Sequence, residues 1–162
     1  MNSDLQSINE LIEVSTRMGL NKNLIQGTGG NTSIKIKDYM MVKASGKHLS
    51  KASSENIFVK LDPKDYYYIK NGEVNIKSIK DLPTKKYKLK PSIEASFHAI
   101  LPNKVILHSH PIEIMAHTML SDFQDKADKA LKGIKWEYVR YARPGEALAS
   151  KISKCINQKN NV

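Results

Sequence analysis

The sequence predicts a layered α/β domain whose sheet is not purely parallel. Segments with the three- and four-residue apolar spacing of helices alternate with short segments rich in branched and aromatic residues, which are typical of strands. Two of these strands meet at Lys37-Asp38, and so short a connection indicates an antiparallel hairpin. Because 162 residues are the length of one ordinary domain and no linker divides them, we expect a single domain over residues 1–162.

The chain is predicted to open with an amphipathic helix. Apolar residues recur every three or four positions from Leu5 to Met18, which places them on one face of a helix. Ser3 is a candidate N-cap with Gln6 three positions later, and the helix is expected to end near Gly19.

Three strands are predicted to follow this helix. Residues 33–37 and 39–43 form the hairpin, and residues 57–61 form a third strand of branched and aromatic residues. Residues 65–90 have the weakest pattern of the chain. Asn71-Gly72 is a turn signal within them, and we assign this region no function.

The second half of the chain is predicted to alternate helices with strands. We expect helices over residues 92–101, 111–120 and 144–158, because apolar residues recur at helical spacing and prolines stand at the boundaries. Strands are expected over residues 104–108 and 136–141, which are short and rich in branched or aromatic residues.

The formal charge of +10 raises the question of a nucleic-acid partner. The positive residues are nearly all lysines spread along the chain, and only Arg17, Arg140 and Arg143 provide the two-pronged donors typical of phosphate and guanine recognition. The densest lysine cluster, within residues 80–90, fits either a solvated loop or a phosphate-facing loop. We therefore expect no nucleic-acid partner.

The sequence has the features of a cytoplasmic protein. Cys155 is the only cysteine, which rules out an intrachain disulfide and fits a reducing compartment. Residues 1–20 lack the basic start and unbroken apolar stretch of a signal peptide, and no apolar run approaches the roughly 20 residues needed to span a bilayer. We expect no membrane association.

The first candidate for chemistry is the pair His108 and His110 at the end of a predicted strand. Residues two apart in a strand point the same way, so both imidazoles can reach one metal ion. Imidazole suits zinc and other divalent transition metals. The same spacing also occurs in surface or core histidines, and that alternative stays open.

The second candidate is Glu94, which is expected near the start of the helix that precedes the histidine strand. A carboxylate there can face the open position of a metal and act as general acid or base. Alternatively, Glu94 only stabilises the helix, since an acidic residue in the first turn contributes about 0.3 to 1 kcal/mol. His98 lies four residues later on the same helical face and is expected to hydrogen-bond locally or to orient Glu94.

Three segments contain the groups from which anion sites are built. The loop 27–31, Ser45-Gly46 and Ser92 offer backbone N–H groups and hydroxyls that can bind a phosphate. Glycine-rich segments are also common as plain turns, and the loop 27–31 matches neither a Walker A loop nor a dinucleotide fingerprint.

Four motifs occur along the chain: Gly29-Gly-Asn-Thr-Ser33, Lys43-Ala-Ser-Gly46, Pro91-Ser-Ile-Glu94 with His98, and His108-Ser-His110. In order and spacing they resemble the motifs of the class II aldolase/adducin family, especially those of its rhamnulose- or fuculose-phosphate-aldolase-like members. The resemblance spans most of the chain.

The resemblance implies a three-layer α/β/α class II aldolase-like domain with a mixed, largely antiparallel central sheet. It also implies a homo-oligomer, commonly a tetramer, that acts as a metal-dependent lyase or related epimerase or dehydratase. The implied substrate is a small, phosphorylated sugar, the intermediate is an enediolate, and the metal is zinc or another divalent transition metal. By position, His108 and His110 match the metal ligands and Glu94 matches the acid/base residue. The positions that match substrate or phosphate binding are Asn31, Ser45, Gly46 and Ser92.

One part of the family pattern has no counterpart in this sequence. Family members take a third zinc-binding histidine from a His-Gly pair after the helix that corresponds to residues 144–158. The sequence contains no His-Gly pair, so we expect a domain that lacks this segment. The remaining histidines, His48, His98 and His117, do not stand where the family places that ligand. The alternative function is therefore a catalytically impaired or inactive relative with a binding or assembly role.

Overall fold

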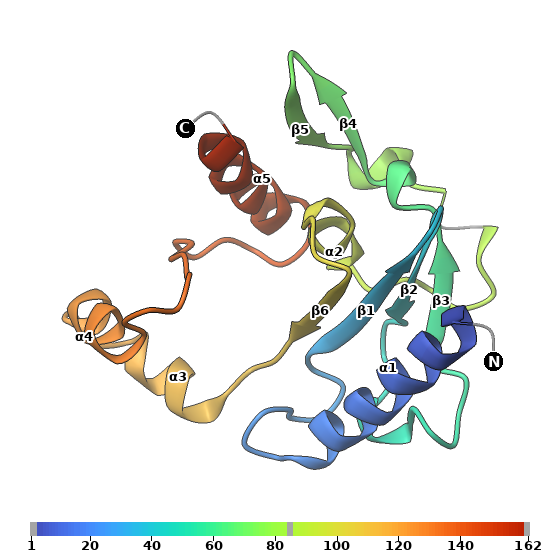
Figure 1. Ribbon diagram of the computed structural model, residues 1–162, viewed down its shortest axis with the longest axis horizontal. Helices are drawn as coiled ribbons and strands as arrows, with labels where there is room; N and C mark the ends of the chain where they lie inside the picture. Colours follow the sequence, from blue (N-terminus) through green and yellow to red (C-terminus); the bar gives the residue numbers. More distant parts are fainter. Residues whose placement is uncertain (1–2, 84–85, 161–162) are drawn as a thin grey trace.

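The computed structural model describes residues 3–83 and 86–160, and a four-stranded sheet lies at its centre (Figure 1). Its strands are β1 (Asn31–Ile36), β2 (Tyr39–Lys43), β3 (Phe58–Leu61) and β6 (Val105–His108). They stand in the order β3-β2-β1-β6, and every pairing described among them is antiparallel. The expectation of a sheet that is not purely parallel is therefore confirmed.

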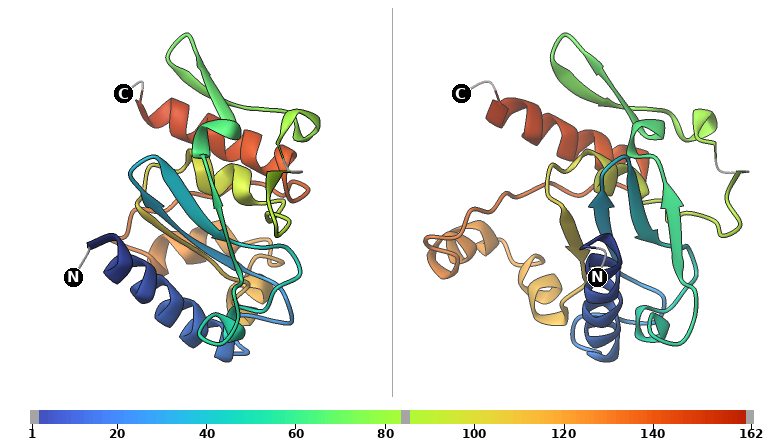
Figure 2. Two further views of the ribbon diagram at one scale, coloured as in Figure 1. Left: turned by 90° about the vertical axis from the view of Figure 1, so that its right-hand side faces the viewer. Right: turned by 45° about the vertical axis from the view of Figure 1, so that its right-hand side comes forward.

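Helices cover both faces of this sheet, which confirms the three-layer arrangement (Figures 1 and 2). Helix α1 (Ser3–Leu20) packs on one face, where Leu11 joins a buried cluster with Ile34 and Ile36 of β1. Helix α2 (Ala95–Ile100) packs on the other face, and α5 (Glu146–Asn160) lies against α2. Strand β1 supplies Ile34 and Ile36 to the α1 side, and β2 supplies Met40 and Val42 to the α2 side.

Strand register places polar side chains on the face that α2 covers. Asn31 and Ser33 alternate with the apolar residues that face α1, and they stand opposite His108 and Ile106 of β6. Asn31 is 2% exposed and Ser33 is fully buried. The sheet therefore brings a buried amide and hydroxyl next to the end of β6.

A small hairpin forms in the region where the sequence pattern is weakest. Strands β4 (Tyr67–Lys70) and β5 (Glu73–Ile76) pair around Asn71-Gly72, both of which have positive φ, as the turn signal predicts. The side chain of Asn157 in α5 holds this hairpin: its Oδ1 accepts from the backbone N–H of Val74 at 2.9 Å, and its Nδ2 donates to the carbonyl of Val74 at 3.1 Å.

Among the described residues, the remaining elements are short helices. They are α3 (Ile112–His117), α4 (Phe123–Ala130) and three 3₁₀ turns at Leu49–Lys51, Pro63–Asp65 and Ile79–Asp81. No described helix combines the length and apolar character needed to cross a membrane.

Several element boundaries differ from the sequence predictions. The strand predicted over residues 136–141 is wrong: this segment is irregular and pairs with no described strand. The outer edge of β6 has no partner strand among the described residues, so the branched and aromatic composition of the segment is not by itself enough to bring it into the sheet. Helix α2 begins at Ala95 instead of Ser92, because Ser92 to Glu94 form a turn, and α3 ends at His117 instead of near residue 120. The sequence did not predict α4.

Candidate acid/base and metal site

Glu94 lies at the N-cap position of α2, where a turn directs its side chain to the start of β1. The Ser92 hydroxyl accepts a 3.2 Å hydrogen bond from the backbone N–H of Glu94 and stabilises this turn. The side-chain amide of Asn31 donates to Oε2 of Glu94 at 2.7 Å and to the hydroxyl of Ser92 at 3.2 Å. Three of the predicted site residues are thus in direct contact.

His108, the last residue of β6, reaches the same carboxylate. Its Nδ1 lies 3.0 Å from Oε2 of Glu94, and the side chains are only 22% and 14% exposed. The two groups are within ion-pair distance, although their geometry is not that of a well-aligned hydrogen bond. The Oδ1 atom of Asn31 is likewise buried without a hydrogen-bond partner. Unpartnered buried polar atoms are costly, so their presence here favours a site that binds a ligand or an ion.

His110 stands beside His108. The two ring centroids are 4.8 Å apart and the ring planes meet at 70°. The backbone N–H of His110 donates to the carbonyl of Leu24 at 2.8 Å, which fixes the chain as it leaves β6. Gly29 leaves room for this ring, because a Cβ atom on Gly29 would lie 3.0 Å from Nδ1 of His110. The glycine-rich loop is therefore shaped around the second histidine.

These histidines fit two positions around a divalent transition metal. Imidazole nitrogens suit zinc and its neighbours, and the unpartnered Nδ1 of His108 is chemically suited to an added ion. A catalytic zinc usually has three protein ligands. Within residues 3–83 and 86–160, however, no group of three or more His, Cys, Asp or Glu is arranged to hold a metal. The described donor set is therefore partial.

The electrostatics of the site favour an ionised Glu94 and a neutral His110. Burial acts to raise the pKa of Glu94, but His108, the Asn31 amide and His98 together hold this pKa below its ordinary value. Burial and the neighbouring His108 lower the pKa of His110, and Glu94 only partly opposes them. A neutral imidazole is the form that binds a metal, and an ionised carboxylate is the form that accepts a proton.

The two other predicted anion-binding residues, Ser45 and Gly46, are the exposed residues of the loop 44–47. An isolated bridge pairs Ala44 with Pro91, and the backbone N–H of Ser45 donates to the carbonyl of Lys90 at 2.9 Å. This loop is therefore held beside Ser92 through backbone contacts. No described side-chain contact joins Ser45 or Gly46 to Glu94 or the histidines.

His98 has a different role from the one expected from its spacing. It is fully buried, and its Nδ1 lies 2.7 Å from the hydroxyl of Ser33, so it links α2 to β1 and does not hydrogen-bond to the side chain of Glu94. Its Nε2 atom has no hydrogen-bond partner. Sequence reasoning missed the Ser33 contact, although polar Asn31 and Ser33, two positions apart in a predicted strand region, were a usable signal.

Sequence reasoning also assigned no role to Lys43, the last residue of β2. It is 2% exposed, and its Nζ donates to the carbonyls of Thr28 at 2.9 Å and Lys47 at 2.7 Å. The Lys43-Ala-Ser-Gly46 motif can be recognised in the sequence, but the burial of its lysine depends on the tertiary structure.

Comparisons with known proteins agree with this architecture. Residues 9–162 match the family described as the Class II Aldolase and Adducin N-terminal domain. The chain is 29% identical to a protein of Bacillus subtilis (strain 168) named uncharacterized oxidoreductase YuxG, over 93% of the chain and 24% of that protein. The chain thus spans about a quarter of the length of this curated relative.

A solved structure resembles the fold as well. It is the N-terminal class II aldolase domain of a conserved protein from Thermoplasma acidophilum, with a TM-score of 0.72 and 26% sequence identity. The similarity covers 91% of this chain and 74% of that structure. The family match over nearly the whole length, together with this shared fold, shows that the chain belongs to the class II aldolase/adducin family.

Proposed function

We propose that the protein is a metal-dependent lyase of the aldolase type, or a related epimerase or dehydratase, that acts on a small phosphorylated sugar. The single observation that carries this proposal is the position of the Glu94 carboxylate, which lies 2.7 Å from the Asn31 amide and 3.0 Å from Nδ1 of His108. Ionisable groups with shifted pKa values gather at functional sites, and this carboxylate is largely buried, has a lowered pKa and contacts a histidine ring nitrogen.

Glu94 is the proposed general acid/base. Its lowered pKa keeps it ionised near neutral pH, so it can accept a proton from a carbon next to a carbonyl and later return a proton. Asn31 orients the carboxylate through Oε2. Because the Glu94 side chain is 14% exposed, it has limited access to water and can be reached from the surface.

His108 and His110 are the proposed ligands of zinc or another divalent transition metal. When bound, such an ion acts as a Lewis acid that polarises a substrate carbonyl. The described residues offer two imidazoles, so a further ligand has to come from outside them. Asn31, Ser45, Gly46 and Ser92 are the proposed contacts of the substrate phosphate and the adjacent hydroxyls.

We also propose that the protein is a homo-oligomer, most simply a tetramer, in the cytoplasm. Large apolar side chains of α3 and the turn after it are open to solvent: Ile114 is 56% exposed and Met119 is 86% exposed. Exposed apolar side chains gathered in one segment are typical of interaction surfaces. Light scattering of the full chain would contradict this proposal if it gave the mass of a monomer at micromolar concentration.

Turnover of a panel of ketose phosphates tests the catalytic proposal. The full chain is loaded separately with zinc, cobalt and manganese, and aldol cleavage and epimerisation are followed. We expect turnover with at least one metal, and a loss of about 10² or more in kcat in Glu94→Gln with the metal retained. Glu113→Gln, which removes an exposed glutamate from α3, is the matched control and should leave kcat unchanged.

A second candidate function is a catalytically impaired relative with a binding or assembly role. The observation that favours it is the partial donor set, with two histidines and no third ligand among the described residues. Bound metal without turnover of any ketose phosphate would support this alternative. Stoichiometric metal together with turnover that Glu94→Gln abolishes would eliminate it.

A further inference from the structure

Three polar side chains on one face of β1 contact three different parts of α2. Asn31 donates to the side chain of Glu94 at the N-cap, and the hydroxyl of Ser33 contacts a side chain in the middle of the helix. Two positions further along the same face, the Nζ atom of Lys35 donates to the carbonyl of Leu101 at the C-cap. Strand β1 thus holds α2 at both ends, and Lys35 holds the end opposite Glu94.

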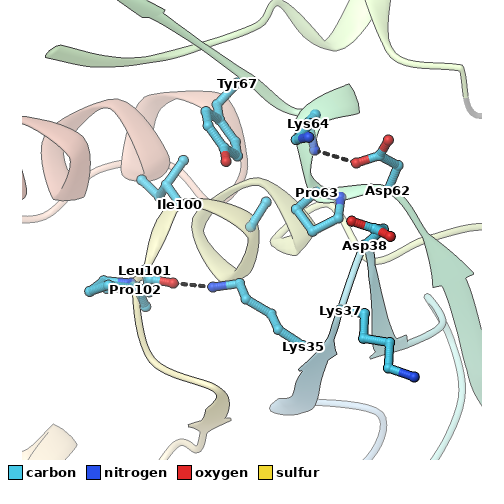
Figure 3. Close-up of a pocket in the computed structure, with 11 residues that line it drawn as sticks. Lys35, Lys37, Asp38, Asp62, Pro63, Lys64, Tyr67, Ile100, Leu101 and Pro102 are labelled. Atoms are coloured by element: carbon cyan, nitrogen blue, oxygen red, sulfur yellow. Dashed lines mark hydrogen bonds between the residues drawn. The ribbon is translucent and has the colours of Figure 1, made fainter. Parts of the chain in front are cut away.

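The half-buried Lys35 borders a cavity at this end of the sheet (Figure 3). The cavity has a volume of about 290 Å³ and lies between the β1–β2 turn, the 3₁₀ turn Pro63–Asp65 and the end of α2. Besides the carbonyl of Leu101, Nζ donates to that of Asn103 at 3.4 Å. No ion pair is described for Lys35 within residues 3–83 and 86–160. The amine therefore lies beside a cavity that a small reagent can enter, without a carboxylate in contact.

Burial without a counter-charge makes this amine a better nucleophile. Loss of water disfavours the ammonium form, and burial lowers the pKa of Lys35 to about 8. At pH 8 about half of such amines are neutral, compared with roughly 0.3% for a lysine of the ordinary pKa of 10.5. Only the neutral form has the free electron pair that attacks an acyl carbon.

The charges around the cavity favour an anionic reagent. Among the described residues that line it, Lys35, Lys37 and Lys64 stand with two acidic residues, Asp38 and Asp62, so positive charge is in excess (Figure 3). An acyl phosphate combines negative charge with an acyl carbon that is activated by its leaving group. This class of reagent therefore fits both the charge of the cavity and the nucleophile at its edge.

We propose that Lys35 is an acylation site for small acyl phosphates and that its acylation loosens α2 at the end opposite Glu94. The electron pair of Nζ attacks the acyl carbon, so that a C–N bond forms and the C–O bond to phosphate breaks. Phosphate leaves with the bonding electrons, and one Nζ proton passes to solvent. The acylated nitrogen has a single N–H and no charge, so it no longer donates to both carbonyls at the end of α2.

Two other lysines separate accessibility from a lowered pKa. The pKa of Lys43 is also lowered to about 8 by burial, with Glu94 acting in the opposite direction, but Lys43 is only 2% exposed. Lys37 lines the same cavity as Lys35, but its side chain is 75% exposed and its Nζ lies 3.2 Å from Oδ2 of Asp4. Of these three lysines, Lys35 alone combines a half-buried amine, no paired carboxylate and an adjoining cavity.

Labelling of the folded full chain with acetyl phosphate at pH 8 tests the proposed site, with peptide mass spectrometry as the readout. We expect Lys35 to be acetylated at least tenfold faster than Lys37, and Lys43 to stay unlabelled over the same period. In guanidinium chloride the three lysines should react at similar rates, because the unfolded chain lacks the cavity. A folded chain in which Lys35 reacts no faster than Lys37, or no faster than Lys43, would overturn the proposal.

Hydrogen exchange tests the effect on α2. The reaction is stopped below one acetyl group per chain, and cation exchange isolates the singly acetylated protein, which has lost one positive charge. The backbone amides of His98 and Leu101, which bond within α2, should exchange at least threefold faster in this fraction than in the unmodified protein. Lys35→Arg keeps a charged donor that is not acylated, so its singly acetylated fraction should exchange as its unmodified protein does.

Equal exchange in the two wild-type fractions would overturn the link to α2, and so would the same acceleration in Lys35→Arg. The labelling comparison uses the wild type alone, so it tests the acylation site even if Lys35→Arg does not fold. Neither experiment involves metal or turnover. Its failure therefore leaves the proposed function unchanged, and a failure of the proposed function leaves the acylation site unchanged.

Discussion

The amide of Asn31 donates a 2.7 Å hydrogen bond to Oε2 of Glu94, although the two residues are 63 positions apart in the sequence. Asn31 begins β1 and stands opposite His108 in β6, so the sheet itself aligns the amide, the carboxylate and the imidazole. The hydrogen bond also helps to hold the pKa of Glu94 below its ordinary value. Asn31 is therefore expected to control both the position and the ionisation of Glu94.

Replacing Asn31 by Asp should shift the pH dependence of catalysis. Asn31 is 2% exposed, and aspartate has the same shape, so the packing is kept. The change places a second carboxylate beside Glu94, and two adjacent carboxylates do not both ionise easily. We expect the apparent pKa of the acidic limb in the pH profile of kcat/KM to rise by roughly one unit or more. Asn103→Asp makes the same charge change at an exposed position and should leave the profile in place. An unshifted profile in Asn31→Asp would show that this hydrogen bond does not set the ionisation of Glu94.

Gly29→Ala should weaken metal binding. The new Cβ atom would lie 3.0 Å from Nδ1 of His110 and 2.9 Å from the backbone carbonyl of Gln26, so the ring or the loop has to move. Displacing a metal ligand in this way typically costs about 10- to 100-fold in affinity, which a zinc competition titration measures. Gly27→Asn alters the same loop where a Cβ has open space, and asparagine tolerates its positive φ. Equal affinities in these two variants would argue against His110 as a ligand.

His98 should make the protein less stable as the pH falls. Burial, with the help of His108 and Lys35, lowers the pKa of His98 to about 3 from 6.5, against the opposing effect of Glu94. Between these values the unfolded chain binds a proton that the folded chain does not. The contribution of His98 to the free energy of unfolding is thus complete above about pH 6.5. It is lost as the pH falls toward 3, at about 1.4 kcal/mol per pH unit.

Urea unfolding at several pH values between 4.5 and 7.5 measures this effect. The wild type is compared with His98→Gln, because other groups, such as His110 with its lowered pKa, also change the stability with pH. These groups are present in both proteins, so the difference between the two free energies of unfolding isolates His98. The difference in the free energy of unfolding between the two proteins should narrow as the pH falls. A difference that is constant with pH would contradict the account of a buried neutral His98.

Local patterns were sufficient to predict most of the sheet and its covering helices. Lys37-Asp38 between two branched segments predicted the β1–β2 hairpin, and the helical spacing from Leu5 to Met18 predicted α1. The segment 136–141 has an equally convincing strand composition, yet it forms no strand. Composition reports how well a segment fits a sheet, whereas pairing also requires the fold to bring the segment alongside an edge strand such as β6.

The candidate site was predicted in its parts but not in its contacts. The spacing of His108 and His110 and the helix start near Glu94 are local features, so the sequence pointed to them directly. The hydrogen bond from Asn31 and the link from His98 to Ser33 join distant segments, and only the fold brings these residues together. The burial of Lys43 depends in the same way on two loops that meet in space.

The central claim is that Glu94 moves a proton at a carbon beside a carbonyl when the histidine pair holds a metal. Hydrogen exchange of dihydroxyacetone phosphate in heavy water, followed by nuclear magnetic resonance, tests it most directly, because the exchange does not depend on which sugar is cleaved. We expect exchange with the metal-loaded wild type and a loss of about 10² or more in Glu94→Gln. Exchange that is undiminished in Glu94→Gln, or no exchange by a wild type with bound metal, would contradict the claim.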